Sequence, residues 1–411
     1  MKVLHLNTTD IEGGAARAAR RLHLGLREMD VQSHMLVRGK YGSGAGISSS
    51  KTLPSMVTAK LERVPVSRYR DRKAPMFSSQ LFPGFVGKKI EGLDPDIINL
   101  HWICDGYVPI SLLGQLKQPL VWTLHDMWPF TGGCHYSQEC NRFMDACGAC
   151  PHLGSSKERD LSRRIWQKKQ RAWKNLNLTV VALCQWMADL SQKSSLFRDV
   201  PVEIIPNGID IQAYRPLDKM AARRFLGLPE DKQLVLFGAL KATGDARKGF
   251  HLLKPALQQL ARLDSTQDTE LVIFGSSTPD NPPDFGRPAH YLGSFSDDIS
   301  LAMIYSAADV FVAPSVQENL ANTVVEALAC GTPCVAFDIG GMPDMIDSET
   351  NGYLARPYET EDLAKGIAWV LQHNRDRILD INARSTAEKK FSLETQARAY
   401  SRLYDKILSS S

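Results

Sequence analysis

The stretch that most limits how this chain can fold runs from Ser315 to Pro333. A short apolar run with β-branched residues, 309–314, precedes it and predicts a buried strand. After a loop, helix-forming residues begin at Asn322 and stop at Gly331, so the pattern predicts a strand, a loop and a helix. Such a helix presents free backbone N–H groups and the positive end of its dipole, which favour a phosphate.

Two carboxylates in this stretch indicate which other groups the phosphate-containing ligand has. Glu318 lies in the predicted loop, and Glu326 follows one turn inside the helix. This separation keeps the two side chains from pairing, so we expect one to face the ligand of the loop. The other is placed to accept hydrogen bonds from neighbouring hydroxyls, such as those of a ribose. The alternative is an ordinary loop with two solvated carboxylates.

The spacing Glu318-x7-Glu326 followed by Gly331-Thr-Pro333 resembles the signature of retaining nucleotide-sugar glycosyltransferases of family 4. The resemblance implies an α/β fold of GT-B architecture, with two Rossmann-like doubly wound domains that face each other across a cleft. It also implies that Glu318 holds hydroxyls of the donor sugar and that Glu326 binds the ribose. No cofactor is expected to take part in catalysis.

The length of 411 residues allows two or three domains, and we expect two. Residues 1–200 are predicted to form an acceptor-binding domain, with a cysteine-rich insert at about 132–153. Residues 201–390 are predicted to bind the nucleotide sugar, and an amphipathic helix within 391–411 is expected to return to the first domain.

Composition excludes several other classes. With 43% hydrophobic and 23% charged residues, the chain is neither disordered nor fibrous. A net charge of +4 is too small to indicate a nucleic-acid partner. The first ten residues fall short of a signal peptide, and no run reaches the roughly 18 apolar residues of a spanning helix. We therefore expect a cytoplasmic protein.

A doubly wound domain is predicted at the start of the chain. Residues 2–7 read as a buried strand and 15–29 as a helix, with Gly13 and Gly14 in the loop between them. Paired glycines let a ligand approach the backbone, and the resemblance places this loop near the donor phosphates. A plain tight turn is the alternative. Residues 39–94 are rich in Gly, Ser, Pro and Arg, and we expect an irregular region there.

Histidines end two further predicted strands, 96–101 and 120–125. Because the carboxyl ends of strands in an open α/β sheet carry ligand-binding groups, His125 is predicted to be a site residue. His101 is equally compatible with the core and with the site. The resemblance places His125 against the donor sugar, while Asp126 is expected to orient either the loop or the imidazole.

The insert after this strand contains four cysteines, with two of them in a Cys-x2-Cys pair. That spacing predicts a closed, structural zinc site that braces the loop beside His125. Disulfides, free thiols and an iron–sulfur cluster are the alternatives. The predicted ligands are Cys134, Cys140, Cys147 and Cys150.

Two basic segments carry interleaved apolar residues, 60–73 and 157–174. Both compositions fit contact with an anionic membrane face or a lipid-phosphate acceptor. For the first segment, the sequence favours a solvated loop. For the second, an amphipathic helix with Trp166 and Trp173 is expected, and a cleft-lining or solvated helix is an equal alternative.

Cations that clamp the donor diphosphate are expected after the strand at 233–240. Lys248 matches the lysine of the family pattern, whereas Ala239 stands where the family has an arginine. Lys241 or Arg247 is expected to replace that charge. Together with Asn322 and Thr323 at the predicted helix start, these residues complete the expected donor site.

The resemblance therefore implies a retaining glycosyltransferase, and we expect it to use a UDP- or GDP-sugar. Its acceptor is expected to be a polysaccharide or lipid-linked saccharide of surface polysaccharide biosynthesis, reached by peripheral contact with the inner membrane face. One alternative is a GT-B synthase with a small soluble acceptor. Another is a non-catalytic nucleotide-sugar-binding regulator, and a zinc-dependent nucleic-acid module is poorly supported.

Overall fold

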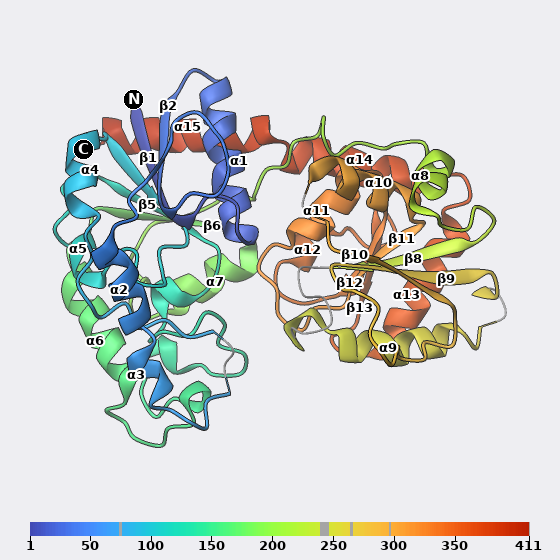
Figure 1. The fold of residues 1–411 in the computed structure, drawn as a ribbon, viewed down its shortest axis with the longest axis horizontal. Helices are drawn as coiled ribbons and strands as arrows, with labels where there is room; N and C mark the ends of the chain where they lie inside the picture. The colour runs from blue at the N-terminus through green and yellow to red at the C-terminus, as the bar shows by residue number, and fades with distance from the viewer. Residues whose placement is uncertain (74–75, 239–245, 264–265, 296, 411) are drawn as a thin grey trace. The chain divides into compact units, whose positions relative to one another are not determined.

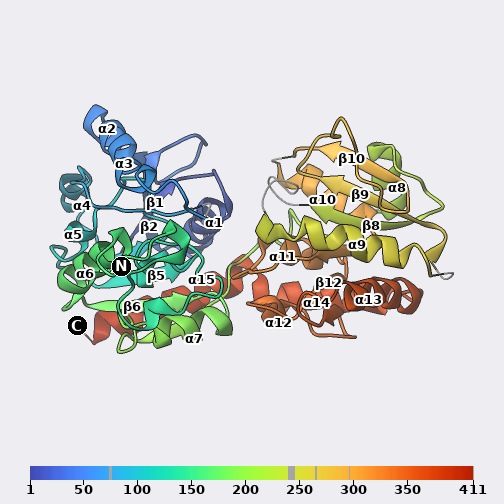
Figure 2. The same cartoon turned by 90° about the horizontal axis from the view of Figure 1, so that it is seen from below.

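The computed structural model describes residues 1–73, 76–238, 246–263, 266–295 and 297–410. These residues form two compact units, which are described separately. Unit 1 consists of 1–206 together with 396–411, and unit 2 of 207–395. Figures 1 and 2 show that each unit has a sheet with helices on both of its faces.

Unit 1 is built on seven parallel strands in the order β3-β2-β1-β4-β5-β6-β7. Four of them, β1, β4, β5 and β6, are short apolar runs that are buried on both faces, as expected for a parallel sheet covered by helices. The strands are β1 (Lys2–Thr9), β2 (Gln32–Gly39), β3 (Ile47–Ser49), β4 (Ile97–Leu100), β5 (Leu120–Leu124), β6 (Leu178–Ala182) and β7 (Val202–Ile204).

Helices cover both faces of this sheet. Residues of α1 and α15 pack with Val3 and Val121 on one face, whereas Leu4 and Trp122 point into the core on the other face. The helices are α1 (Gly14–Glu28), α2 (Leu53–Leu61), α3 (Val64–Ser67), α4 (Gly87–Leu93), α5 (Ile110–Leu113), α6 (Leu161–Trp173), α7 (Gln185–Lys193) and α15 (Leu393–Ser409).

The expectation of an irregular region over 39–94 is wrong in part. This segment contains β3 and the helices α2, α3 and α4. Helix α2 begins with a capping box, because the Thr52 side chain accepts from Ser55 N and the Ser55 hydroxyl accepts from Thr52 N. Pro54 occupies the first turn, where a missing N–H costs nothing. These local signals outweigh the weak hydrophobic periodicity.

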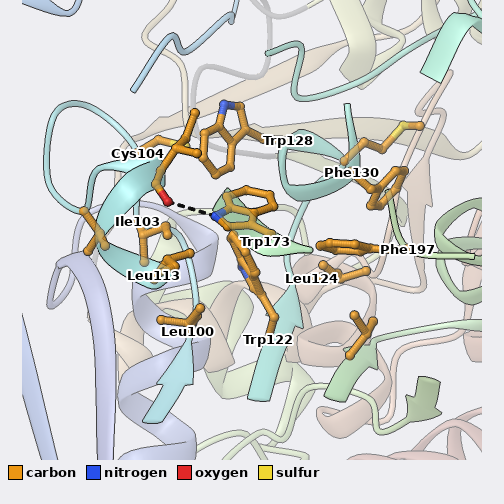
Figure 3. Packing of buried hydrophobic residues seen from close by; sticks show 14 of the residues in the cluster. Leu100, Ile103, Cys104, Leu113, Trp122, Leu124, Trp128, Phe130, Trp173 and Phe197 are labelled. Carbon is orange, nitrogen blue, oxygen red and sulfur yellow. Dashed lines mark hydrogen bonds between the residues drawn. The ribbon is translucent and has the colours of Figure 1, made fainter. Parts of the chain in front are cut away.

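Aromatic side chains fill the larger core of unit 1, as Figure 3 shows. The rings of Trp122 and Trp173 meet edge to face with centroids 5.2 Å apart, and Trp128 lies 6.2 Å from each. Trp173 donates from Nε1 to the carbonyl oxygen of Ile110 at 2.9 Å. Helix α6 is thereby fixed against the sheet by its buried indole.

The C-terminal helix α15 completes the opposite face of unit 1. In both views this red helix runs beside the strands of the unit (Figures 1 and 2). Tyr404 Oη accepts from Asn99 Nδ2 at 2.7 Å, and Tyr400 Oη lies 2.8 Å from Thr123 Oγ1. Two hydroxyls of the helix thus satisfy polar groups buried in β4 and β5.

Unit 2 has six parallel strands in the order β10-β9-β8-β11-β12-β13. They are β8 (Gln233–Gly238), β9 (Thr269–Phe274), β10 (Ala289–Gly293), β11 (Val310–Ala313), β12 (Cys334–Phe337) and β13 (Gly352–Ala355). The helices are α8 (Lys219–Leu226), α9 (Phe250–Leu260), α10 (Asp298–Ala307), α11 (Asn322–Ala329), α12 (Met342–Met345), α13 (Thr360–His373) and α14 (Ile378–Phe391).

The core of unit 2 also lies on both faces of its sheet. Helices α9 and α13 pack on one face against Val235 and Val312, and Tyr305 of α10 meets Phe311 on the other with ring centroids 5.5 Å apart. The predicted α/β class with two doubly wound parallel sheets is confirmed. No helix in the described ranges is long and apolar enough to cross a membrane.

Candidate functional site

A cation and a carboxylate meet where two neighbouring strands of unit 2 end. The loop after β11 carries Glu318, and the 3-10 turn 246–248 that follows β8 carries Lys248. Lys248 Nζ lies 2.6 Å from Glu318 Oε2, and Ser315 Oγ donates to the same oxygen at 3.4 Å. Glu318 is 7% exposed, so its carboxylate is largely shielded from bulk water, whereas the Lys248 side chain is 23% exposed.

Two glycines let the backbone segments of this site approach one another. Gly249 has φ +72°, and a Cβ there would lie 1.7 Å from the carbonyl oxygen of Pro314. Gly340 has φ +55°, and a Cβ there would lie 2.0 Å from the carbonyl oxygen of Glu318. Both positions therefore require glycine for conformation and for space. The result is a loop held closely between the 3-10 turn and the start of α12.

Helix α11 begins as the sequence predicts, at Asn322. The residue before it, Ala321, has no side chain that could cap the first N–H groups. Asn322 and Thr323 are partly exposed, and Asn207 Nδ2 donates to Asn322 Oδ1 at 3.3 Å. The first turn thus keeps the features of an anion site next to the loop of Glu318.

Glu326 lies in the second turn of α11 and is buried, with 4% of its surface exposed. The hydroxyl of Tyr305 donates to Glu326 Oε2 at 3.0 Å. Burial and the neighbouring Glu326 carboxylate raise the pKa of Tyr305 well above its usual value, so the phenol remains a donor. Glu318 and Glu326 do not form a pair with each other, and ribose binding by Glu326 stays a prediction.

The structure describes only one of the other two cations that were predicted to bind the phosphates. Arg247 lies beside Lys248 in the 3-10 turn, and its carbonyl oxygen accepts from Val316 N at 2.8 Å. Lys241 and Ala239 lie outside the described residues. Which cation replaces the missing arginine of the family pattern therefore stays a prediction.

Three histidines from adjacent strands of unit 1 form a hydrogen-bonded row. His101 Nδ1 lies 3.0 Å from His125 Nε2, and His101 Nε2 lies 3.0 Å from His5 Nδ1 of strand β1. Burial lowers the pKa of His5 and His101 well below the usual value. Burial also lowers the pKa of His125 to about 4, although Asp126 opposes this shift. The row is therefore neutral at physiological pH.

His5 was not among the predicted site residues. Its signal in the sequence is a polar side chain in the middle of an otherwise apolar strand, Val-Leu-His-Leu-Asn. His101, for which core and site were equally compatible, is 4% exposed and contacts the predicted site residue His125. His125 itself is partly exposed.

Asp126 orients the loop after β5. Its carboxylate accepts from Trp128 N at 2.9 Å and from Trp102 Nε1 at 2.9 Å, and it lies 2.7 Å from His135 Nδ1. These contacts fix the turn that begins the cysteine-rich insert. These contacts go to the loop and to Trp102, which favours the first of the two predicted roles.

Gly13 and Gly14 lie at the start of α1, after β1. Gly13 has φ +90°, which favours glycine, and a Cβ there would meet no atom within 4 Å. The backbone therefore faces open space at this point. This is the geometry of an approachable loop, and its predicted contact with donor phosphates stays a prediction.

The four cysteines of the insert line one small cavity of about 10 Å³. None of the eight cysteines of the chain forms a disulfide. Burial raises the pKa of Cys134, Cys147 and Cys150, while hydrogen bonds from the backbone oppose the rise at Cys147 and Cys150. In the described ranges, no group of three or more His, Cys, Asp or Glu is arranged to hold a metal ion. Zinc stays a prediction for Cys134, Cys140, Cys147 and Cys150.

Lys169 departs from the expected pattern of the basic helix. Its side chain is fully buried, and Nζ donates to the carbonyl oxygens of Trp128 and Thr131, the latter at 3.0 Å. The amino group also lies 3.6 Å from the ring centroid of Trp128. This lysine belongs to the core, so only the remaining cations of α6 can attract an anionic surface.

Comparison with known families agrees with this arrangement. The family described as Glycosyltransferase Family 4 matches residues 12–213, and the one described as Glycosyl transferases group 1 matches residues 231–373. The chain belongs to glycosyltransferase family 4. The two matches cover most of both units, and the second includes Lys248, Glu318 and Glu326.

Proteins of similar sequence are named as glycosyltransferases. A D-inositol 3-phosphate glycosyltransferase from Corynebacterium jeikeium is 26% identical over 340 residues, which are 77% of this chain and 74% of that protein. An enzyme of the same name from Saccharomonospora viridis is 32% identical over 205 residues. That match spans less than half of either chain, 46% of each.

Solved structures show the same fold. Sucrose-phosphate synthase from Thermosynechococcus elongatus superposes with a TM-score of 0.69 at 20% identity, covering 100% of both chains. Anabaena Alr3699/HepE in complex with UDP and glucose gives 0.66 at 19% identity, covering 99% of this chain and 100% of the other. WaaG, a glycosyltransferase involved in lipopolysaccharide biosynthesis, gives 0.64 at 16% identity, with coverage of 98% and 99%. The chain therefore has the GT-B architecture of this family.

Proposed function

We propose that this protein is a retaining glycosyltransferase that moves a sugar from a UDP- or GDP-sugar to a saccharide acceptor. The observation that carries the proposal is the pairing of Lys248 with Glu318 at 2.6 Å, beside the uncapped start of α11. Ligands of open parallel sheets bind at this carboxyl edge. The UDP and glucose bound to the similar Anabaena protein support a nucleotide-sugar donor.

The proposed chemistry needs positive charge opposite a leaving diphosphate. As the sugar becomes oxocarbenium-like, Lys248 and the first N–H groups of α11 stabilise the charge that develops on the phosphates. In this scheme Arg247 adds a second cation to that site. Gly13 and Gly14 are further proposed donor-binding positions, because the backbone at Gly13 faces open space.

The remaining assigned residues hold the sugars of the donor. Glu318 accepts hydrogen bonds from hydroxyls of the transferred sugar, and Glu326 accepts them from the ribose. His125 contacts the transferred sugar. Because Lys248 is already bound to Glu318, a change at either residue affects both the phosphates and the sugar.

The donor site is tested by thermal denaturation with UDP-, GDP-, ADP- and TDP-sugars. A ligand that binds only the folded chain stabilises it by mass action, by about 2.7 kcal/mol at one hundred times its Kd. We expect one nucleotide class to raise the Tm of the wild type. Lys248→Ala and Glu326→Ala should lose this shift, whereas Lys365→Ala, at an exposed lysine of α13, should keep it.

Two outcomes contradict the donor proposal. The first is that none of the nucleotide sugars raises the Tm of the wild type. The second is that Lys248→Ala and Glu326→Ala keep the full shift. Binding without any transfer or hydrolysis of the sugar would favour a non-catalytic nucleotide-sugar-binding regulator.

For the acceptor, we propose a polysaccharide or lipid-linked saccharide at the inner face of a membrane. Support comes from the apolar-basic face of α2 and α3, where large apolar side chains and cations are exposed together. Leu53 is 80% exposed and Val57 is 56% exposed. Such a surface inserts apolar groups among lipids and attracts anionic headgroups. The face consists of Leu53, Met56, Val57, Leu61 and Val64 with Lys51, Lys60, Arg63 and Arg68.

A second candidate is a GT-B synthase with a small soluble acceptor. The names of the similar sequences favour it, because D-inositol 3-phosphate is a small molecule. The fold shared with sucrose-phosphate synthase is compatible with it as well. The two candidates differ in whether the protein binds a lipid surface.

Flotation with lipid vesicles separates these candidates. We expect the wild type to float with phosphatidylcholine vesicles that contain anionic lipid, and to float less as salt rises. Leu53→Asp with Val57→Asp should abolish flotation, whereas Phe225→Asp, at a residue of unit 2 that is 75% exposed, should not. A wild type that stays with the unbound fraction at low salt supports the small soluble acceptor.

A further inference from the structure

The row of His5, His101 and His125 joins three adjacent strands of unit 1. His5 lies in β1, His101 follows β4 and His125 follows β5. Both nitrogen–nitrogen distances are 3.0 Å. The centroids of neighbouring rings are 5.3 Å apart in both pairs, and their planes are inclined by 28° and 30°. The four ring nitrogens that face one another therefore form two hydrogen bonds, and each of these bonds needs one hydrogen.

Only two arrangements of hydrogens satisfy both links when all three rings are neutral. Each neutral imidazole carries one N–H, so the donors must all point in the same direction along the row. In the first arrangement His5 donates from Nδ1 to His101, and His101 donates from Nδ1 to His125. In the second arrangement every hydrogen is on Nε2 and the direction is reversed.

The buried end of the row distinguishes these arrangements. His5 is 0% exposed, and its Nε2 has no hydrogen-bond partner among the residues that the structure describes. The second arrangement would place an N–H on this atom, and a buried N–H without an acceptor is rare and unfavourable. The first arrangement leaves only an unshared lone pair there, so it is favoured.

The first arrangement determines what His125 offers to a ligand. Its Nε2 lone pair is occupied by the hydrogen of His101, and its own hydrogen is on Nδ1. The titratable groups around the row are His23 and His34 near His5 and Asp126 near His125. Of these, only Asp126 favours a cationic imidazole at His125, and it is bound to His135, Trp102 and Trp128 instead.

We propose that His101, with His5 behind it, is a positioning residue that fixes His125 as a neutral imidazole with its hydrogen on Nδ1. His125 then recognises an oxygen atom of the transferred sugar as an N–H donor and does not accept a proton from the acceptor. This inference rests on the proposed function for the identity of the ligand, whereas the state of the row is independent of it.

The state of the row is measured by NMR of protein labelled with ¹⁵N at histidine, at pH 7.5 without ligand. Long-range ¹H–¹⁵N spectra distinguish protonated from unprotonated ring nitrogens. We expect the wild-type His125 to be neutral with its hydrogen on Nδ1. A hydrogen on Nε2, or a cationic ring, would overturn the proposal even if no variant folds.

Variants then test the role of His101. His101→Phe keeps a ring but removes the donor, so His125 should change to the Nε2–H form and kcat/KM for the donor sugar should fall about tenfold. His101→Gln retains an N–H donor, so His125 should stay mainly in the Nδ1–H form and most of the wild-type kcat/KM should remain. The control, His34→Phe, removes a half-buried histidine bonded to Ser48 and should leave His125 unchanged. An unchanged tautomer in folded His101→Phe contradicts the proposal.

The two levels of the proposal fail in different ways. If the Nδ1–H form is found but no nucleotide sugar binds, the proposed function is wrong and the arrangement of the row stands. If nucleotide sugars bind but His125 carries its hydrogen on Nε2, the inference is wrong and the donor site stands.

Discussion

At the scale of single residues, Lys169 gives a pH dependence that can be measured. Burial lowers its pKa to about 7, whereas the pKa of a lysine in the unfolded chain is about 10.4. Between these pH values the unfolded chain binds one more proton than the folded chain. The free energy of unfolding therefore rises with pH by up to about 1.4 kcal/mol per unit, and this contribution is lost as the pH falls towards 7.

Lys169→Met keeps the length of the side chain and removes the titration. We expect the difference in unfolding free energy between wild type and variant to become larger, in favour of the wild type, from pH 7.5 to pH 9. Urea denaturation at both pH values measures this difference. Lys174→Met, at an exposed lysine after the same helix, serves as the control and should show no such change. An identical pH dependence in wild type and Lys169→Met contradicts the assignment.

Gly249 allows a second prediction because the chain contains a matched control. Gly227 has φ +67° and no atom within 4 Å of an added Cβ, whereas Gly249 has φ +72° and a clash with Pro314. Gly227→Ala should cost about 1 kcal/mol of unfolding free energy from backbone strain alone. Gly249→Ala should cost more than about 3 kcal/mol and should abolish stabilisation by the nucleotide sugar. Equal costs at both positions would show that the close approach is unimportant.

The sequence placed Lys248 and Glu318 after two predicted strands, and the structure has them there. Their roles were assigned through the family resemblance and stay predictions. Their pairing was not predicted, because 70 residues separate them in the chain. His5 and Lys169 were missed for the same reason, since their partners lie 96 residues and 38–41 residues away.

At the scale of elements, apolar runs located the strands well. The predicted strands at 2–7, 96–101 and 120–125 correspond to β1, β4 and β5, with ends that differ by one or two residues. Helices α2 and α4 were missed because they are short and have few buried residues, so their periodicity is weak. Tertiary packing and caps determine such elements more than composition does.

The cysteine-rich insert carries a prediction at this scale. We expect one equivalent of zinc in protein purified without chelator, because four thiols line one cavity and zinc binds thiolates tightly. Metal analysis by mass spectrometry measures the content. Cys147→Ser should lose the metal, whereas Cys334→Ser, in strand β12 of unit 2, should retain it. Metal-free wild type with eight titratable thiols would establish that the insert is held by packing alone.

At the scale of the whole molecule, the C-terminal helix is tied to the first unit through buried hydroxyls. Tyr404→Phe leaves Asn99 Nδ2 without its partner, so unit 1 should lose about 1–3 kcal/mol of stability. Tyr291→Phe is the matched control, because the Tyr291 hydroxyl has no hydrogen-bond partner among the described residues. That substitution should alter the free energy of unfolding by no more than about 0.5 kcal/mol. Urea unfolding followed by tryptophan fluorescence measures both, and equal effects would contradict the role of the helix.

The membership of residues 396–411 in unit 1 also sets an order of events during synthesis. A ribosome makes 1–206 first, but one face of that sheet stays without α15 until all of 207–395 has emerged. Unit 2 is therefore the first to have its complete sequence, although its residues come later. Throughout translation of unit 2, the apolar face of the unfinished unit 1 is open to chaperones, and a prematurely terminated chain exposes it permanently.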